Sequence, residues 1–64
     1  MDTVRVVVAD DNVQLRDMIV EYLQAQNGLE IVGAASDGVE ALRLVTEFEP
    51  DVLVCDLIMP QMDG

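Results

Sequence analysis

The amino-acid sequence predicts an α/β protein built on a parallel sheet. Apolar runs of strand length, at residues 4–9, 30–34 and 51–55, alternate with two segments in which apolar residues recur at helical spacing. The connections are short, and no repeat or low-complexity segment interrupts the order strand, helix, strand, helix, strand. That order is typical of parallel strands joined by crossover helices.

The first predicted strand, "VRVVVA" at residues 4–9, is almost continuously apolar after Arg5. Valine is β-branched and suits a pleated strand, and an unbroken apolar run indicates that both faces of the strand are covered. We therefore expect this strand to lie in the centre of the sheet.

The first predicted helix covers residues 14–26. Its apolar side chains recur at i, i+3, i+4, i+7 and i+8, which places them on one face: Leu15, Met18, Ile19, Tyr22 and Leu23. Asn12 is a suitable cap for the start of this helix, and Asn27-Gly28 is a suitable stop.

The second predicted strand, "EIVGA" at residues 30–34, leads into a second helix within residues 36–48. The apolar face of that helix is expected to consist of Ala41, Leu42, Val45 and Phe48. Asp37 followed by Glu40 resembles a capping box. Pro50 ends the helix, because proline disfavours helical geometry in the residue before it.

The third predicted strand, "DVLVC" at residues 51–55, precedes a loop. Pro60 fixes the course of that loop, and Asp63-Gly64 is a turn signal. We interpret Met59 and Met62 as loop packing rather than partner contacts, and Cys55 as a small core residue rather than a redox group.

The composition excludes several functional classes. Thirteen acidic residues and three arginines, with no lysine and no histidine, give a net charge of −10. Such a chain repels nucleic-acid backbones and lacks a basic surface to bind them, so we expect no nucleic acid to bind this segment. Without histidine, a metal site must rely on oxygen ligands and a hard ion.

A cytoplasmic location is expected. The single cysteine cannot form an internal disulfide, and the start "MDTVRV" lacks the basic and apolar regions of a signal peptide. The longest apolar runs are far shorter than the roughly 20 residues that span a membrane. We therefore expect no membrane partner.

Three carboxylates follow two of the predicted strands. Asp10 and Asp11 come directly after the first apolar run, and Asp56 comes directly after the third. Right-handed crossovers bring the carboxyl ends of parallel strands to one edge, so we expect these side chains to meet there. Clustered like charges destabilise a fold unless a cation offsets them, and Mg²⁺ suits a site with few carboxylates and room for phosphate.

An alternative interpretation of Asp10 and Asp11 is a pair of acids at a helix N-terminus, where the helix dipole favours negative charge.

Two other kinds of ligand site are disfavoured by the sequence. A nucleotide site needs glycines after the first strand, where this chain has "ADDNVQL". A phosphohydrolase with a D-x-D motif needs a second acid two places after Asp56, where Ile58 stands.

These residues resemble the receiver domain of two-component response regulators, which has the flavodoxin-like fold of the chemotaxis response regulators. The matching features are the acidic pair in "VVADDN", the position of Asp56, and "DLIMPQMDG", which is similar to the family's D-x-x-M-P-x-M-D-G loop. The resemblance covers residues 1–64 and implies the first half of that domain, a β-α-β-α-β unit with strand order 2-1-3.

The resemblance implies that a histidine kinase or phosphotransfer protein passes a phosphoryl group to Asp56. Mg²⁺, or another hard ion such as Mn²⁺ or Ca²⁺, would be held by the side chains of Asp11 and Asp56 and the backbone carbonyl of Ile58. Asp10 would act mainly through a water. The chain would promote only its own phosphorylation and dephosphorylation, and would not be an enzyme.

Within the family, the segments "VADDN", "PDVLV" and "IMPQMDG" are most similar to receivers of sporulation regulators from endospore-forming bacteria. This likeness implies an effector that controls transcription. The residues expected to support the site are those of the loop: Met59, Pro60, Asp63 and Gly64.

The sequence departs from the family pattern because it matches only the first half of the domain. The family's later hydroxyl, aromatic switch residue and lysine have no counterpart here, and the chain contains no lysine at all. The alternative function is therefore a truncated metal-binding and protein-interaction fragment that cannot signal by phosphotransfer. The third strand would be an exposed apolar edge, through which two copies could associate.

Overall fold

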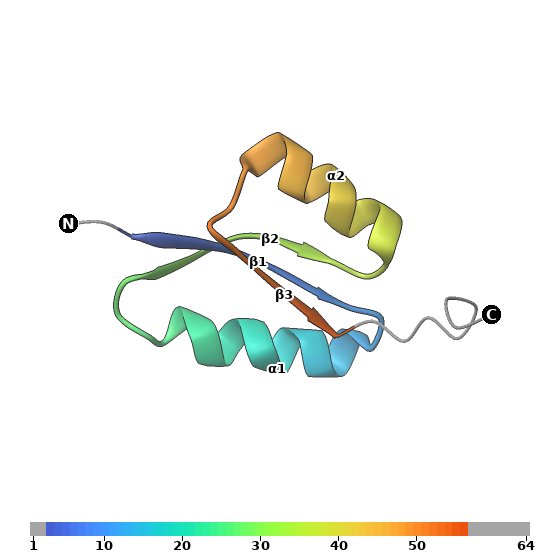
Figure 1. Ribbon diagram of the computed structural model, residues 1–64. Helices are drawn as coiled ribbons and strands as arrows, with labels where there is room; N and C mark the ends of the chain where they lie inside the picture. Colours follow the sequence, from blue (N-terminus) through green and yellow to red (C-terminus); the bar gives the residue numbers. More distant parts are fainter. Residues whose placement is uncertain (1–2, 57–64) are drawn as a thin grey trace.

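A computed structural model describes residues 3–56, which form a three-stranded sheet with one helix on each face (Figure 1). The elements follow in the predicted order: β1 (Val4–Asp10), α1 (Val13–Gln24), β2 (Leu29–Ala35), α2 (Gly38–Phe48) and β3 (Val52–Asp56). The strand order is β2-β1-β3, and both pairings are parallel. The predicted α/β class, strand order and central position of the first strand are confirmed.

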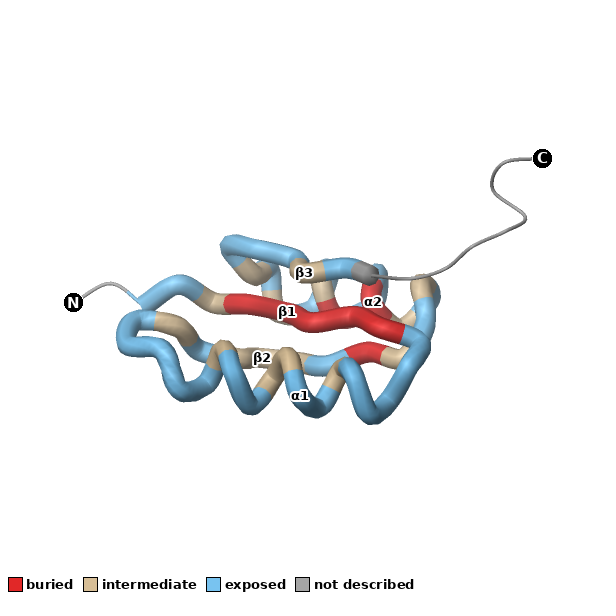
Figure 2. The backbone as a smooth tube through the Cα atoms, turned by 90° about the horizontal axis from the view of Figure 1, so that it is seen from below, coloured by how far each residue is buried: buried red, intermediate tan, exposed pale blue. Residues whose placement is uncertain are grey.

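Strand β1 is the centre of the core. Its side chains from Val6 to Asp10 are all buried, and those of Val7 and Val8 are fully so. Figure 2 shows this buried segment running along the middle of the sheet. Because alternate side chains of a strand point to opposite faces, an unbroken valine run supplies apolar side chains to both helical layers.

The pairing of β1 with β3 is regular from Val6↔Val52 to Asp10↔Asp56. The start of this ladder is closed by Arg5 and Asp51. The backbone N–H of Arg5 donates to Asp51 Oδ2 at 2.9 Å, and the backbone N–H of Asp51 donates to the Arg5 carbonyl at 2.8 Å. These bonds fix the register of β3 against β1 at Asp51, immediately before β3 begins.

Helix α1 begins one residue before the predicted start at residue 14 and ends two residues before the predicted end at residue 26. The Asn12 side chain caps it, because its Oδ1 accepts a hydrogen bond from the Leu15 N–H at 3.0 Å. Gly28, predicted to stop the helix, lies in the turn beyond it with φ of 86°. Its carbonyl accepts from the Val4 N–H at 2.8 Å, so this glycine directs the chain into β2.

The predicted apolar face of α1 faces a groove instead of a closed core. Met18 and Tyr22 are 65% and 68% exposed, and no residue of α1 is fully buried. The groove has a volume of about 450 Å³ and lies between α1 and β3, with these lining residues: Leu15, Met18, Ile19, Tyr22, Leu23 and Val54.

Helix α2 is capped by Asp37, whose Oδ1 accepts from the Glu40 N–H at 2.7 Å. The predicted capping box is shifted by one residue, because Glu40 Oε1 accepts from the Ser36 N–H at 3.0 Å instead of from Asp37. The helix ends at Phe48 and is capped by Glu49, which adopts a left-handed conformation with φ of 48° immediately before Pro50.

The predicted apolar face of α2 is wrong at one position. Ala41 and Leu44 are the buried residues of this helix, whereas Leu42 is 67% exposed. Leu44 packs over Gly33 of β2, where a Cβ atom would lie only 3.1 Å from Leu44 Cδ1. The missing side chain of Gly33 therefore lets the helix approach the sheet through Leu44.

Strand β3 forms one edge of the sheet, as the sequence predicts. Both helices pack mainly on β1 and β2, and Val52 and Leu53 each remain 44% exposed. Cys55 is exposed, so its predicted core position is wrong. The physical reason is that Cys55 lies on an edge strand, which the two described helices cover little.

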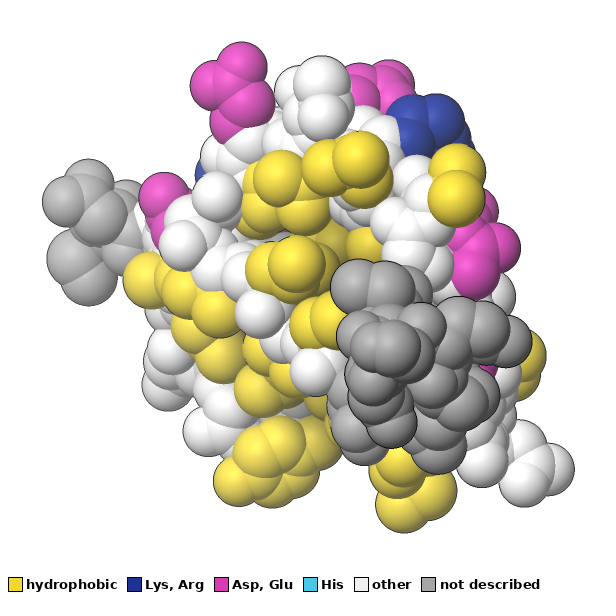
Figure 3. Space-filling model, turned by 45° about the vertical axis from the view of Figure 1, so that its right-hand side comes forward, with side chains coloured by type: hydrophobic (Ala, Val, Ile, Leu, Met, Phe, Trp, Pro, Cys, Tyr) yellow, Lys and Arg dark blue, Asp and Glu magenta, His cyan; other side chains and the backbone are white. Residues whose placement is uncertain are grey.

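The space-filling view in Figure 3 shows several hydrophobic patches on the surface, as expected of a sheet that is covered only in part. Neither helix of the described residues is long and apolar enough to cross a membrane.

Candidate metal and phosphoacceptor site

Two aspartates end adjacent strands at the same edge of the sheet. Asp10 is the last residue of β1, Asp56 is the last residue of β3, and the two are register partners. Neighbouring strands lie about 4.8 Å apart, so the two backbones are in direct contact at this point. The expected convergence of the carboxyl ends is confirmed for the backbone of these two residues.

The Asp10 carboxylate is buried and only half satisfied. The residue is only 1% exposed, and its Oδ1 accepts from the Asn12 N–H at 2.8 Å. Its Oδ2 is buried and has no hydrogen-bond partner among the described residues. A buried carboxylate oxygen without a partner is costly, so this atom fits a site that takes up a cation or a metal-bound water.

Asp11 follows in the bend between β1 and α1, and it is exposed. The alternative interpretation, in which the acidic pair serves the helix N-terminus, has limited support. Asn12 provides the cap, and the first turn of α1 contains no acidic residue. The Asp10 side chain bonds to the N–H of Asn12, outside the helix.

The arginines of the chain are engaged elsewhere. Among the described residues, Arg43 pairs with Glu47 at 3.2 Å, and Arg16 contacts Asp17 at 3.4 Å. Arg5 donates to the Glu49 carbonyl at the opposite end of the sheet. None of these contacts neutralises Asp10, and a hard divalent cation has the oxygen-ligand preference that this edge requires.

Several predicted site residues cannot be placed. The side chain of Asp56 lies outside the described part of the structure, as do the loop residues Ile58, Met59, Pro60 and Asp63-Gly64. Among the described residues, no three acidic or cysteine side chains gather closely enough to hold a metal. The ligand set that includes Asp56 and Ile58 therefore stays a prediction.

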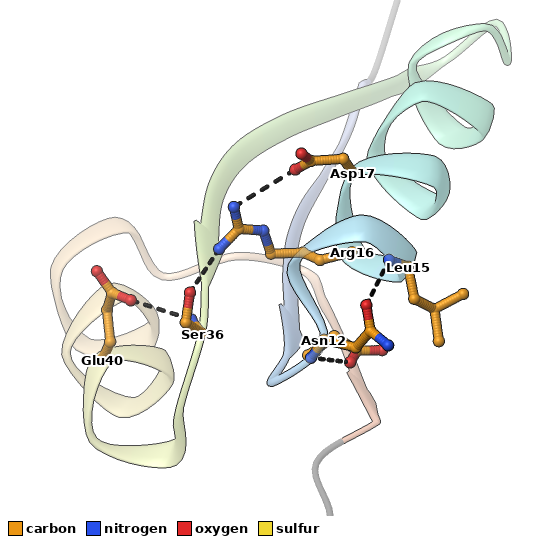
Figure 4. A network of polar contacts seen from close by, with 7 residues as sticks. Asn12, Leu15, Arg16, Asp17, Ser36 and Glu40 are labelled. Carbon is orange, nitrogen blue, oxygen red and sulfur yellow. Dashed lines mark hydrogen bonds and ion pairs between the residues drawn. The ribbon is translucent and has the colours of Figure 1, made fainter.

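A polar network beside the site was not predicted (Figure 4). Arg16 Nη1 of α1 donates to Ser36 Oγ at 2.6 Å, and the Ser36 N–H donates to Glu40 Oε1 of α2. Arg16 and Ser36 are twenty residues apart, so helical or strand spacing gives no signal for their contact. Only the fold brings them together.

Comparisons with known proteins agree with this geometry. The family model described as "Response regulator receiver domain" matches residues 6–64. A protein-glutamate methylesterase/protein-glutamine glutaminase 5 from Myxococcus xanthus (strain DK1622) is 48% identical over 61 residues, which are 95% of this chain and 18% of that protein.

The transcriptional regulatory protein LiaR from Bacillus subtilis (strain 168) is 44% identical over 61 residues, which are 95% of this chain and 29% of LiaR. The chain thus spans less than a third of the length of either relative. The family match covers most of the chain, and the fold has the strand order expected of the first half of that domain. This chain belongs to the response regulator receiver domain family.

Proposed function

We propose that this chain is the phosphoacceptor part of a two-component response regulator. It receives a phosphoryl group from a histidine kinase or phosphotransfer protein on Asp56. The observation that carries the proposal is the buried Asp10 carboxylate, whose Oδ2 has no partner among the described residues and whose backbone is paired with that of Asp56. Membership of the receiver family supports the same function.

The proposed ligands of Mg²⁺, or of another hard ion such as Mn²⁺, are the carboxylates of Asp11 and Asp56 and the backbone carbonyl of Ile58, and the Asp10 carboxylate would hold the ion mainly through a bound water. The ion supplies positive charge that offsets the negative charge on the oxygens of the transferred group. The fit rests on the donor set, which is all oxygen, and on the uncompensated Asp10 carboxylate.

In the proposed step, a carboxylate oxygen of Asp56 forms a bond to the phosphorus of the donor. The bond from phosphorus to the donor's histidine nitrogen breaks, and its electron pair stays on that nitrogen. The donor reacts with its other ring nitrogen protonated, so the products are an acyl phosphate on Asp56 and a neutral donor imidazole that keeps this proton. The role of Asp10 and Asp11 is to hold the ion beside the reacting oxygens, because electrostatic stabilisation is the main catalytic need of phosphoryl transfer.

The chain acts on its own aspartate and is not proposed to be an enzyme for external substrates. Methylesterase and glutaminase activities belong to the name of the Myxococcus relative, of which this chain matches 18%. A transcriptional output is supported by the name of LiaR. A sporulation-type output and a cytoplasmic location stay predictions from the sequence.

A second candidate is a metal-binding and protein-interaction fragment that does not signal by phosphotransfer. The observation that favours it is the apolar groove between α1 and the exposed strand β3, where Met18 and Tyr22 are largely exposed. This candidate would bind Mg²⁺ and form no phosphorylated species.

Intact mass spectrometry distinguishes these functions. The chain is incubated with a small acyl phosphate, with and without Mg²⁺, and Mg²⁺ binding is measured separately by calorimetry. We expect the mass of one phosphoryl group to be added only when Mg²⁺ is present. Binding of Mg²⁺ without any adduct would support the fragment, and turnover of small phosphate esters would indicate a hydrolase.

A further inference from the structure

A continuous series of hydrogen bonds starts at the Asp10 carboxylate. The Asn12 N–H donates to Asp10 Oδ1 at 2.8 Å, and the Asn12 carbonyl accepts from the Arg16 N–H at 2.8 Å. The Asn12 side chain also accepts from the Leu15 N–H. The end of β1 at Asp10 is therefore linked through Asn12 to the first turn of α1.

The Arg16 side chain extends this series to the next strand and helix. Its Nη1 donates to Ser36 Oγ, immediately after β2, and the Ser36 N–H donates to Glu40 Oε1 in α2. Figure 4 shows the guanidinium of Arg16 between Ser36 and Asp17. The side chain is only 19% exposed, and its Nε is buried without a partner among the described residues. Burying a guanidinium is costly, so its placement needs a reason beyond surface charge.

We propose that Arg16 and Ser36 are positioning residues for the cation site at Asp10 and Asp11. This inference rests on the proposed function, because it requires that the site bind a divalent ion. The Arg16 backbone N–H donates to the Asn12 carbonyl after β1, and its side chain donates to Ser36 after β2, which in turn donates to Glu40 of α2. The polar series thus fixes the first turn of α1 and the direction of the Asp10 carboxylate.

The direction in which the cation affinity changes when Arg16 is replaced distinguishes a positioning role from a purely electrostatic one. Replacing an arginine by alanine removes a positive charge, and Coulomb attraction alone would then strengthen the binding of a cation. If Arg16 positions the carboxylates, its removal weakens binding instead. Ser36→Ala removes the acceptor for Arg16 Nη1 without any change of charge, so it reports positioning alone.

The test is calorimetric titration of the whole chain with Mg²⁺. Arg16→Ala and Ser36→Ala are each expected to raise the Kd about tenfold, as is typical of residues that orient metal ligands. The double variant is expected to bind nearly as well as either single variant, because both remove the same contact. Arg16→Lys keeps a donor for Ser36 and is expected to restore part of the affinity.

The matched control is Arg43→Ala, which removes the same charge from an exposed pair with Glu47 in α2. Its Kd is expected to stay unchanged or to fall slightly. Far-ultraviolet circular dichroism verifies that each variant is folded, and Ser36→Ala and Arg16→Lys carry the test if Arg16→Ala does not fold.

The outcomes for this inference and for the proposed function are distinct. Absence of Mg²⁺ binding by the unmodified chain contradicts the proposed function and the inference together. Binding by the unmodified chain with an equal or lower Kd for Ser36→Ala overturns only the positioning role.

Discussion

Asp10 and Asp56 are register partners at the ends of two parallel strands, and Arg5 and Asp51 bond to each other at the start of the same ladder. The register of β3 is therefore fixed at the end of the sheet remote from the acidic site. Because a slip of one residue would turn every side chain to the opposite face, these bonds help to keep Asp56 beside Asp10.

Asp10→Asn is expected to stabilise the chain in the absence of Mg²⁺. The substitution removes a buried charge while keeping an oxygen that accepts from the Asn12 N–H. The free energy of unfolding, measured in urea without divalent ions, should rise by about 1–3 kcal/mol. Asp11→Asn is the control, because that residue is exposed and its effect should be within about 0.5 kcal/mol. A less stable Asp10→Asn variant would contradict the cost assigned to the buried carboxylate.

Gly33→Val is expected to destabilise the fold by about 1–3 kcal/mol through overpacking. Its Cβ would lie 3.1 Å from Leu44 Cδ1, on the face where α2 packs against β2. Ala34→Val introduces the same side chain at the next position, which is exposed, and should cost much less. In a double-mutant cycle measured by urea unfolding, Leu44→Val should relieve part of the cost of Gly33→Val. Strict additivity would show that the two residues do not compete for the same space.

Glu49→Gly is expected to raise the free energy of unfolding by on the order of 1 kcal/mol, because a left-handed conformation is costly for a residue with a Cβ atom. Glycine adopts that conformation freely at a helix C-terminus. Glu47→Gly, two residues earlier and inside α2, should instead lower the free energy of unfolding by about 1 kcal/mol. Thermal unfolding of the two variants measures both effects, and equal shifts would refute the conformational explanation.

The unmodified chain is expected to associate with a second copy through β3 at high concentration, because an apolar edge strand is a template for pairing. Leu53→Lys places a charge on that edge and should restore the monomer. Leu42→Lys makes the same change at an exposed position of α2 and should leave the association intact. Light scattering gives the mass of each form, and a monomeric unmodified chain would rule out this association.

The fold was predictable because local signals and the overall pattern agree. The valine run of β1 indicated a strand covered on both faces, and the caps Asn12 and Asp37 both accept the predicted backbone bonds. The errors arise where tertiary packing decides the outcome. Leu42 and Leu44 could not be ranked from helical spacing, because Leu44 is buried through the absent side chain of Gly33 on the neighbouring strand β2.

The candidate site was predictable in part, because its aspartates follow recognisable apolar strands. The topology of parallel strands brings Asp10 and Asp56 to one edge, and the apolar runs before them mark where each strand ends. Two features had no local signal. The contact of Arg16 with Ser36 depends on how α1 lies against β2, and the unpartnered Oδ2 of Asp10 depends on the depth of its burial.

Peptide mass spectrometry after incubation with Mg²⁺ and a small acyl phosphate tests the central claim most directly. The phosphoryl group is expected on the peptide that contains Asp56, to be lost in Asp56→Asn, and to remain in Asp51→Asn, which keeps an oxygen that accepts from Arg5. A phosphoryl group on another peptide, or none on a chain that binds Mg²⁺, would contradict the assignment of Asp56 as the phosphoacceptor.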